Sequence, residues 1–238
     1  MSEVNSVKDK IKSRGYWEVD IRPNEASRDR FDSYLDLKEK LRESVVLIRG
    51  WDYPHFGRHP EPYPRNRRIE SYVDFGTNKE FWTMFLNGHF YHIFACREDW
   101  MSDDVSIFGK HRYSDLEPEK FLGFIMALYS LTEIFEFGIR LAQKEVLGNS
   151  VKISVNLHKM QNRTLATFDP RRFLFRGNYT CREETIPLSC TLSVNDLISE
   201  GHEKAVDFAI SIFHLFNWLN VRRETLIEEQ KKFLEKRF

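Results

Sequence analysis

Cysteine is scarce in this chain, and the sequence motifs of several common enzyme classes are missing. The three cysteines, Cys96, Cys181 and Cys190, show no CxxC spacing. They indicate neither a disulfide framework nor a zinc knuckle, and they suit a reducing compartment. The GxSxG, GxxxxGK[ST], GxGxxG and HExxH patterns are also absent. Their absence argues against a covalent serine hydrolase and against a nucleotide hydrolase with the usual phosphate loop.

The chain has no excess of charge of either sign, and it has no uninterrupted apolar run long enough to span a membrane. Lysine plus arginine equals aspartate plus glutamate, at 36 each, which argues against a general polyanion binder but still permits a local basic groove. The most apolar stretch, 121–141, contains Glu133, Glu136 and Arg140, so it predicts a buried helix and no membrane span. The first 15 residues lack the apolar core of a signal peptide. We therefore expect a cytoplasmic protein without a membrane partner.

Aromatic residues are abundant instead. They make up 14% of the chain, with 20 phenylalanines against 5 methionines, so the core should consist largely of rings. A length of 238 residues allows one large domain, 1–238, although two sub-lobes, 1–148 and 149–238, are conceivable.

Hydrophobic periodicity predicts both strands and helices along the chain. Alternation of apolar and polar residues predicts strands over 16–23, 45–48, 69–75, 89–96, 152–158, 164–168 and 186–192. Spacing of three to four predicts helices over 3–13, 24–43, 118–148, 202–219 and 221–238, with a short helix capped by Ser193. The acidic stretch 98–114 reads as an exposed loop.

The segment 78–86 is ambiguous. Thr77 and Glu80 form a capping-box pattern, and Gly88 lies where a helix favours a left-handed residue. Asn87-Gly88 between two apolar runs is equally a hairpin signal. Two helix-end signals outweigh one turn signal, so a helix over 78–86 is predicted.

These elements alternate irregularly, unlike the repeated strand–helix order of a doubly wound fold. The fold class predicted is α+β. In it, a mixed, mostly antiparallel sheet packs against a long central helix, opened by Pro118, and two C-terminal helices.

The most distinctive stretch is the loop 49–70, which mixes arginines with aromatic rings and prolines. Guanidinium groups bind phosphate or carboxylate, and aromatic faces stack on bases. The candidate ligand-binding residues are Arg49, Trp51, Tyr53, Arg58, Arg65, Arg67 and Arg68. The alternative is a loop that packs its rings on the body and pairs its arginines with Asp52, Glu61 and Glu70.

A metal site is a second hypothesis. Asp52, His55 and His59 lie within the loop, and Asp74 or His89 could complete a ligand set. His92 would point to the opposite face from His89 if 89–96 is a strand. No cofactor is predicted.

Other polar residues have simpler interpretations. Glu133 and Glu136 could act as acids or metal ligands, but Glu136 is also spaced for an ion pair with Arg140. The remaining candidates are Cys190, His214 and Asn217 as core residues, the basic group Arg171, Arg172 and Arg176, and an apolar stripe of Leu226, Ile227, Phe233 and Leu234.

No named chemistry emerges from these patterns. The leading hypothesis is a non-enzymatic binding or regulatory module of a cytoplasmic, microbial assembly, whose loop 49–70 recognises a nucleotide, a nucleic acid or a partner protein. The alternatives are a metal-dependent hydrolase or nuclease, and a structural subunit held in an oligomer through 202–238.

Overall fold

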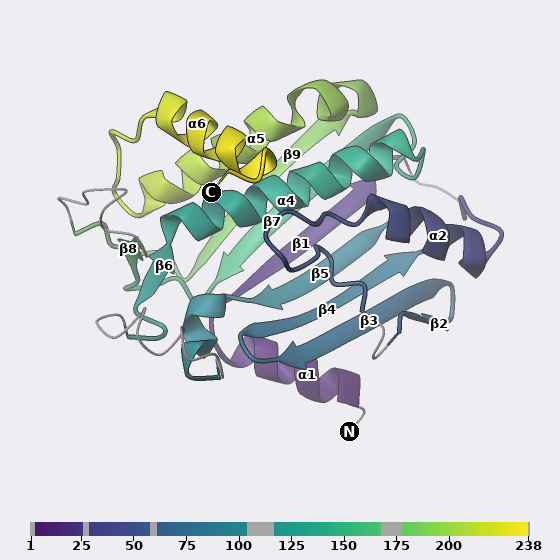
Figure 1. Cartoon of the computed structure of the whole chain (residues 1–238), viewed down its shortest axis with the longest axis horizontal. Helices are drawn as coiled ribbons and strands as arrows, with labels where there is room; N and C mark the ends of the chain where they lie inside the picture. Colours follow the sequence, from purple (N-terminus) through teal and green to yellow (C-terminus); the bar gives the residue numbers. More distant parts are fainter. Residues whose placement is uncertain (1–2, 26–28, 58–60, 104–116, 168–177, 238) are drawn as a thin grey trace.

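The computed structural model describes residues 3–25, 29–57, 61–103, 117–167 and 178–237. A seven-stranded antiparallel sheet forms its centre, in the order β2-β3-β4-β5-β1-β7-β9 (Figure 1). The strands are β1 (Tyr16–Pro23), β2 (Tyr63–Arg65), β3 (Arg68–Phe75), β4 (Asn78–Phe85), β5 (Phe90–Ala95), β7 (Ser150–His158) and β9 (Thr185–Ser193). A separate parallel pair joins β6 (Phe121–Gly123) to β8 (Thr164–Ala166). The predicted α+β class is confirmed.

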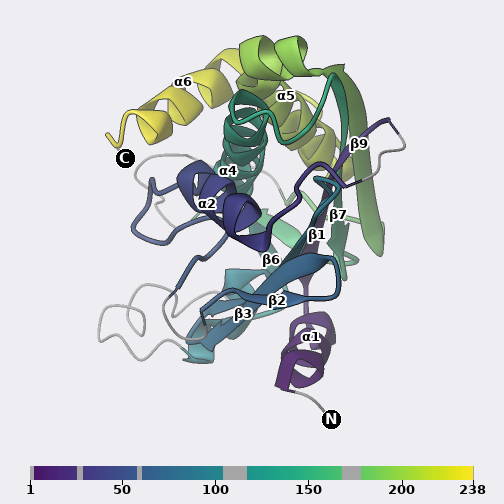
Figure 2. The ribbon, with the colours of Figure 1, turned by 90° about the vertical axis from the view of Figure 1, so that its right-hand side faces the viewer.

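Helices cover the two faces of the sheet unequally (Figure 2). On one side lie α2 (Tyr34–Ser44), α4 (Phe124–Gln143), α5 (Val194–Leu215) and α6 (Arg223–Leu234), and on the other lies α1 (Glu3–Ser13). A 3₁₀ segment, η1 (Arg97–Asp103), follows β5. The central α4 and the C-terminal α5 and α6 agree with the prediction.

Alternation along the strands creates two separate cores. On β1, Trp17, Val19 and Ile21 point to the main core beneath α4. On β4, Trp82 also enters the main core, whereas Phe81 packs with the apolar face of α1. Because successive residues of a strand face opposite sides, one strand supplies both cores.

The prediction of a helix over 78–86 was wrong. Residues Asn78–Phe85 form β4, which pairs with β3 and β5. A hairpin connects β4 to β5, as the alternative predicted, but Leu86 and Asn87 are the central residues of its turn. Gly88 has a φ of +86°, and its amide donates to the Phe85 carbonyl at 3.0 Å. Pairing with a strand on each side outweighs a local capping signal, because propensity is a weak preference that tertiary contacts override.

Further predictions of secondary structure were also wrong. The helix predicted over 24–43 begins only at Tyr34, as α2. Val45–Ile48 is no strand and makes only one bridge, from Val46 to Tyr53. The central helix begins at Phe124, because the residues before it pair with β8. Ser193 caps α5 as expected, accepting from the Asp196 amide at 3.0 Å, but α5 continues unbroken to Leu215.

Two predictions about side-chain environment were also wrong. His214 lies in the last turn of α5 and Asn217 just beyond its end, and both are exposed. In the stretch expected to be an exposed loop, Glu98, Asp99 and Trp100 are buried.

The C-terminal stripe splits between the protein's own core and its surface. Phe233 stacks on Tyr129 of α4, with ring centroids 4.0 Å apart, and Leu226 is buried beside it. Ile227 stays partly exposed. Within the described residues, no helix is both long and apolar enough to cross a membrane.

Candidate binding pocket

The segment 45–57 folds back over the sheet after α2. Val46 and Tyr53 exchange backbone hydrogen bonds of 2.9 and 2.8 Å, which closes the segment into a compact turn. Tyr53 is buried, and its ring contacts His92 and Phe137 at centroid distances of 5.1 and 5.8 Å. The first half of the predicted recognition loop is therefore attached to the core.

One buried carboxylate, that of Glu80 on β4, fixes this segment. It accepts hydrogen bonds from Trp51 Nε1 at 2.9 Å and from the His55 amide at 3.1 Å. His92 Nε2 lies 3.0 Å from the same group. Burial alone would raise the pKa of Glu80, but His92 and the other donors outweigh it and lower the pKa. Glu80 is thus an ionised anchor for the loop.

Asp52 and His55 form a second anchor inside the loop. The carboxylate of Asp52 contacts His55 Nδ1 and accepts from the Phe56 amide at 2.8 Å. Burial would lower the pKa of His55, but its hydrogen bond to Asp52 and the charges of Asp52 and Glu80 outweigh burial and raise the pKa. Burial would raise the pKa of Asp52, yet the bonds from His55 and Phe56 lower it.

These two directions predict a pH-dependent stability. Because folding raises the pKa of His55, protonation of this residue stabilises the folded protein. The stabilisation is fully present below pH 6.5, the usual pKa of histidine, and is lost as the pH rises through the raised pKa. The lowered pKa of Asp52 gives stability lost only as the pH falls through that lowered value. Asp52→Asn should remove the loss above pH 6.5, a difference on the order of 1 kcal/mol. Thermal unfolding of both proteins between pH 5 and 9 measures it, and parallel curves would contradict it.

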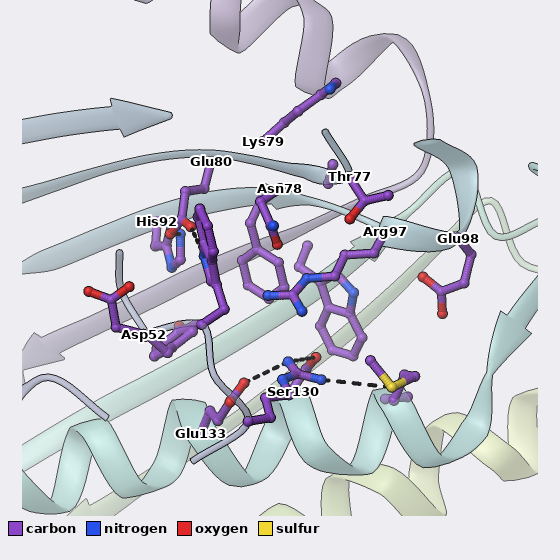
Figure 3. A pocket seen from close by; sticks show the side chains of 18 residues that line it. Asp52, Thr77, Asn78, Lys79, Glu80, His92, Arg97, Glu98, Ser130 and Glu133 are labelled. Atoms are coloured by element: carbon purple, nitrogen blue, oxygen red, sulfur yellow. Dashed lines mark hydrogen bonds and ion pairs between the residues drawn. The ribbon is translucent and has the colours of Figure 1, made fainter. Parts of the chain in front are cut away.

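A pocket lies between this loop, the adjoining strands and α4 (Figure 3). Its cavity volume is about 40 Å³, which corresponds to room for roughly three water molecules. Its walls come from β1, the loop, β4, β5, η1 and α4. Those walls include Trp17, Arg49, Trp51, Tyr53, Asn78, Glu80, His92, Arg97, Glu98, Ser130 and Glu133.

Arg49 enters the pocket from the loop and pairs with α4. Its Nη2 donates to Glu133 Oε2 at 2.6 Å and to Ser130 Oγ at 3.2 Å. Both charged side chains are almost fully enclosed, with 9% of Arg49 and 2% of Glu133 exposed. Burial raises the pKa of Glu133, although the charges of Arg49 and Arg97 act in the opposite direction. Sequence patterns indicated both residues separately but not their contact.

Arg97 differs from Arg49 because no carboxylate of the described residues contacts it directly, although the charges of Glu133, Glu80 and Glu98 are near. In the described part of the chain, Arg97 makes no hydrogen bond or ion pair. Figure 3 shows its side chain extending into the pocket beside Asn78, whose buried Oδ1 also has no hydrogen-bond partner. Burial, followed by the charge of Arg49, lowers the pKa of Arg97 to about 10. The guanidinium of Arg97 thus remains charged at neutral pH.

Sequence reasoning missed Arg97, since it placed this residue at the end of a strand beside a supposedly exposed loop. The position of Arg97 depends on a buried ion pair that holds the same 3₁₀ segment, η1, in place. Arg163 Nη1 and Nη2 each donate to an oxygen of Asp99 at 2.6 Å. Asp99 also accepts from the Gly15 amide at 2.8 Å, where a Cβ would lie 2.3 Å from Arg163 Nη2. This pair ties η1 to the start of β1 and to the β7–β8 connection.

The arginines of the predicted loop lie in different parts of the structure and have different partners. Arg49 lines the pocket, with Trp51 and Tyr53. Arg65 and Arg68 instead contact Glu70, at 3.0 and 3.2 Å. Arg67 pairs with Asp29 at 2.7 Å, and the predicted Arg58 lies outside the described residues.

Among the described residues, Asp52 and His55 contact each other, but the other possible metal ligands have different partners. Asp74 contacts Lys10 at 2.8 Å and Lys79 at 3.1 Å, and His89 contacts Asp20 at 2.7 Å. The part of the chain that the structure describes contains no group of three or more His, Cys, Asp or Glu suited to a metal. The proposed ligand His59 lies outside it, as do Arg171, Arg172 and Arg176.

The expected pairing of Glu136 is confirmed. Its carboxylate contacts Arg140 at 2.7 Å and also His202 of α5 at 2.9 Å. Cys190 is half-buried on β9, packed against the main core. These residues have structural partners and lie outside the lining of the pocket.

Comparison of the chain with models of protein families, with curated proteins and with solved structures gives no match in any of the three. The function of the pocket therefore has to be inferred from its own chemistry.

Proposed function

We propose that this protein is a non-enzymatic binding module whose pocket receives a carboxylate group of its ligand. The observation that carries the proposal is Arg97, a partly buried guanidinium that lines the pocket and has no acceptor among the described residues. Partial burial of a charge without a partner is costly, and a bound anion offsets that cost through charge-assisted hydrogen bonds.

The size of the pocket favours a small group. A cavity of about 40 Å³ holds the equivalent of roughly three waters, which suits a carboxylate but not a nucleobase. The ligand would therefore insert only its acidic end. Trp51 and Trp17 on the walls would contact the apolar atoms next to that end.

The charges of the pocket favour a monoanion. Arg49 is already paired with Glu133, so among the described residues Arg97 is the lining cation without a direct ion-pair partner. Glu80 and Glu98 also line the pocket and would repel a second negative charge. A carboxylate carries one charge, whereas a phosphate monoester carries up to two. A carboxylic acid, or an acidic end of a partner protein, fits better than a nucleotide phosphate.

Arg97→Gln tests the proposal, because it removes the unpaired charge and keeps a polar side chain of similar length. Titrating the wild type with small monocarboxylates should change tryptophan fluorescence, since Trp17 and Trp51 line the pocket. The variant should bind at least tenfold more weakly, the loss expected for a charge-assisted hydrogen bond. Isothermal titration calorimetry gives the two dissociation constants.

Arg67→Gln is the matched control, because Arg67 is an exposed arginine paired with Asp29 and is absent from the pocket. It should bind the same carboxylates as tightly as the wild type. Equal weakening in both variants, or no carboxylate binding by the wild type, would contradict the proposal.

A further inference from the structure

A second feature, on the opposite face of the sheet from the pocket, concentrates positive charge. There α1 runs beside β3 (Figure 2). A groove of about 380 Å³ opens between α1 and the β2–β3 turn. We define this α1 groove by the side chains that line it, which are Val4, Asn5, Lys8, Arg65, Asn66, Arg68 and Glu70. Three of these residues are cationic and one is acidic.

The single carboxylate holds the two arginines in place. Glu70 is buried, and it accepts from Arg65 Nε at 3.0 Å, Arg68 Nε at 3.2 Å and the Tyr63 hydroxyl at 3.0 Å. Both arginine contacts use Nε, the nitrogen nearest the backbone. The outer ends of the guanidinium groups are therefore left for another acceptor, and no other carboxylate of the described residues is in ion-pair contact with them.

Lys8 adds a third charge from α1. Its Nζ lies 3.7 Å from the centroid of the Phe81 ring and makes no ion pair among the described residues. Burial lowers the pKa of Lys8. The charge of Glu70 raises this pKa, whereas the charges of Arg68 and Lys12 lower it further. The like charges around Glu70 repel one another, which a bound anion would relieve.

We propose that the α1 groove binds the phosphate group of a small phosphate monoester. Lys8, Arg65 and Arg68 exceed the charge of Glu70 by two, and a phosphate monoester carries about −1.5 to −2 at pH 7. The guanidinium ends and the Lys8 ammonium are suitable donors for its three terminal oxygens. Asn5 and Asn66 at the rim can donate to the hydroxyl groups of the remainder. A groove of this volume suits a small molecule.

Isothermal titration calorimetry at low salt with glycerol phosphate, and with glycerol as the phosphate-free control, tests the site. Only the phosphate should bind, and the affinity should fall below pH 6 as the phosphate loses its second charge. Lys8→Met and Arg65→Gln should each weaken binding about tenfold. Lys8→Met leaves every ion pair of Glu70 in place, so its effect cannot come from an unpaired buried carboxylate.

Two controls separate this site from the rest of the molecule. Arg182→Gln removes an equal charge at an exposed position outside the groove, and Arg97→Gln alters only the pocket. Both should bind glycerol phosphate like the wild type. No binding by the wild type, equal loss in Arg182→Gln, loss in Arg97→Gln, or binding of oligonucleotides or phosphopeptides alone would overturn the proposal.

Discussion

Replacing Asp99 with alanine is expected to lower the free energy of unfolding by about 3–5 kcal/mol. The substitution leaves the guanidinium of Arg163 buried, with only 2% of its side chain exposed, and removes both 2.6 Å contacts. It also deprives the Gly15 and Glu119 amides of their acceptor. Urea unfolding followed by circular dichroism measures the loss as a lower midpoint with an unchanged slope.

The double variant Asp99→Leu with Arg163→Met is the informative control. Removing both charges leaves no uncompensated ion, so it should be more stable than Asp99→Ala. Asp29→Ala breaks the exposed contact to Arg67 and should cost at most about 1 kcal/mol. If Asp99→Ala and Asp29→Ala cost the same, the buried pair does not have the role assigned to it.

Replacing Glu80 with alanine is expected to lower the free energy of unfolding by about 3 kcal/mol. It should also release the segment 45–57 from the sheet. The change leaves Trp51 Nε1 and the His55 amide without their shared acceptor and removes the carboxylate that lies 3.0 Å from His92 Nε2. Each buried donor that loses its partner costs about 1–3 kcal/mol, reduced where water can reach it. Trp51 fluorescence should shift to longer wavelength, and amide exchange should accelerate in 45–57 but not in β7.

Trp51→Phe removes only one of these hydrogen bonds and keeps an aromatic ring against His55. It should therefore cost about 0.5–1.5 kcal/mol, with slow exchange retained at the His55 amide. Exchange rates in 45–57 that stay at wild-type values in Glu80→Ala would show that the loop is held by other contacts, above all the burial of Tyr53.

Much of the secondary structure was determined by local sequence patterns. The alternation of Trp17, Val19 and Ile21 specified β1, because strict alternation fits only a strand with one face in the core. The spacing of apolar residues similarly specified α4, and the hydroxyl of Ser193 specified the start of α5. Each of these signals depends on a few consecutive residues, so it can be recognised without knowing which segments pack against them.

The structure of 78–86 and the composition of the pocket were decided only by tertiary contacts. The capping-box pattern at Thr77 and Glu80 indicated a helix, yet Glu80 instead anchors the distant Trp51 and His55. Likewise Arg49 is 84 positions from Glu133, and Asp99 is 64 from Arg163.

By itself, then, the sequence determined the α+β class and the aromatic core, and it indicated the loop arginines as candidate anion ligands but neither Arg97 nor Lys8. The tertiary structure decided which arginines are neutralised, leaving Arg97 unpaired in the pocket and placing Arg65 and Arg68 in the α1 groove. The physical reason is that a charge acquires its environment from whatever packs around it. Burial and ion pairing depend on segments that the chain brings together from far apart, and no local periodicity encodes them.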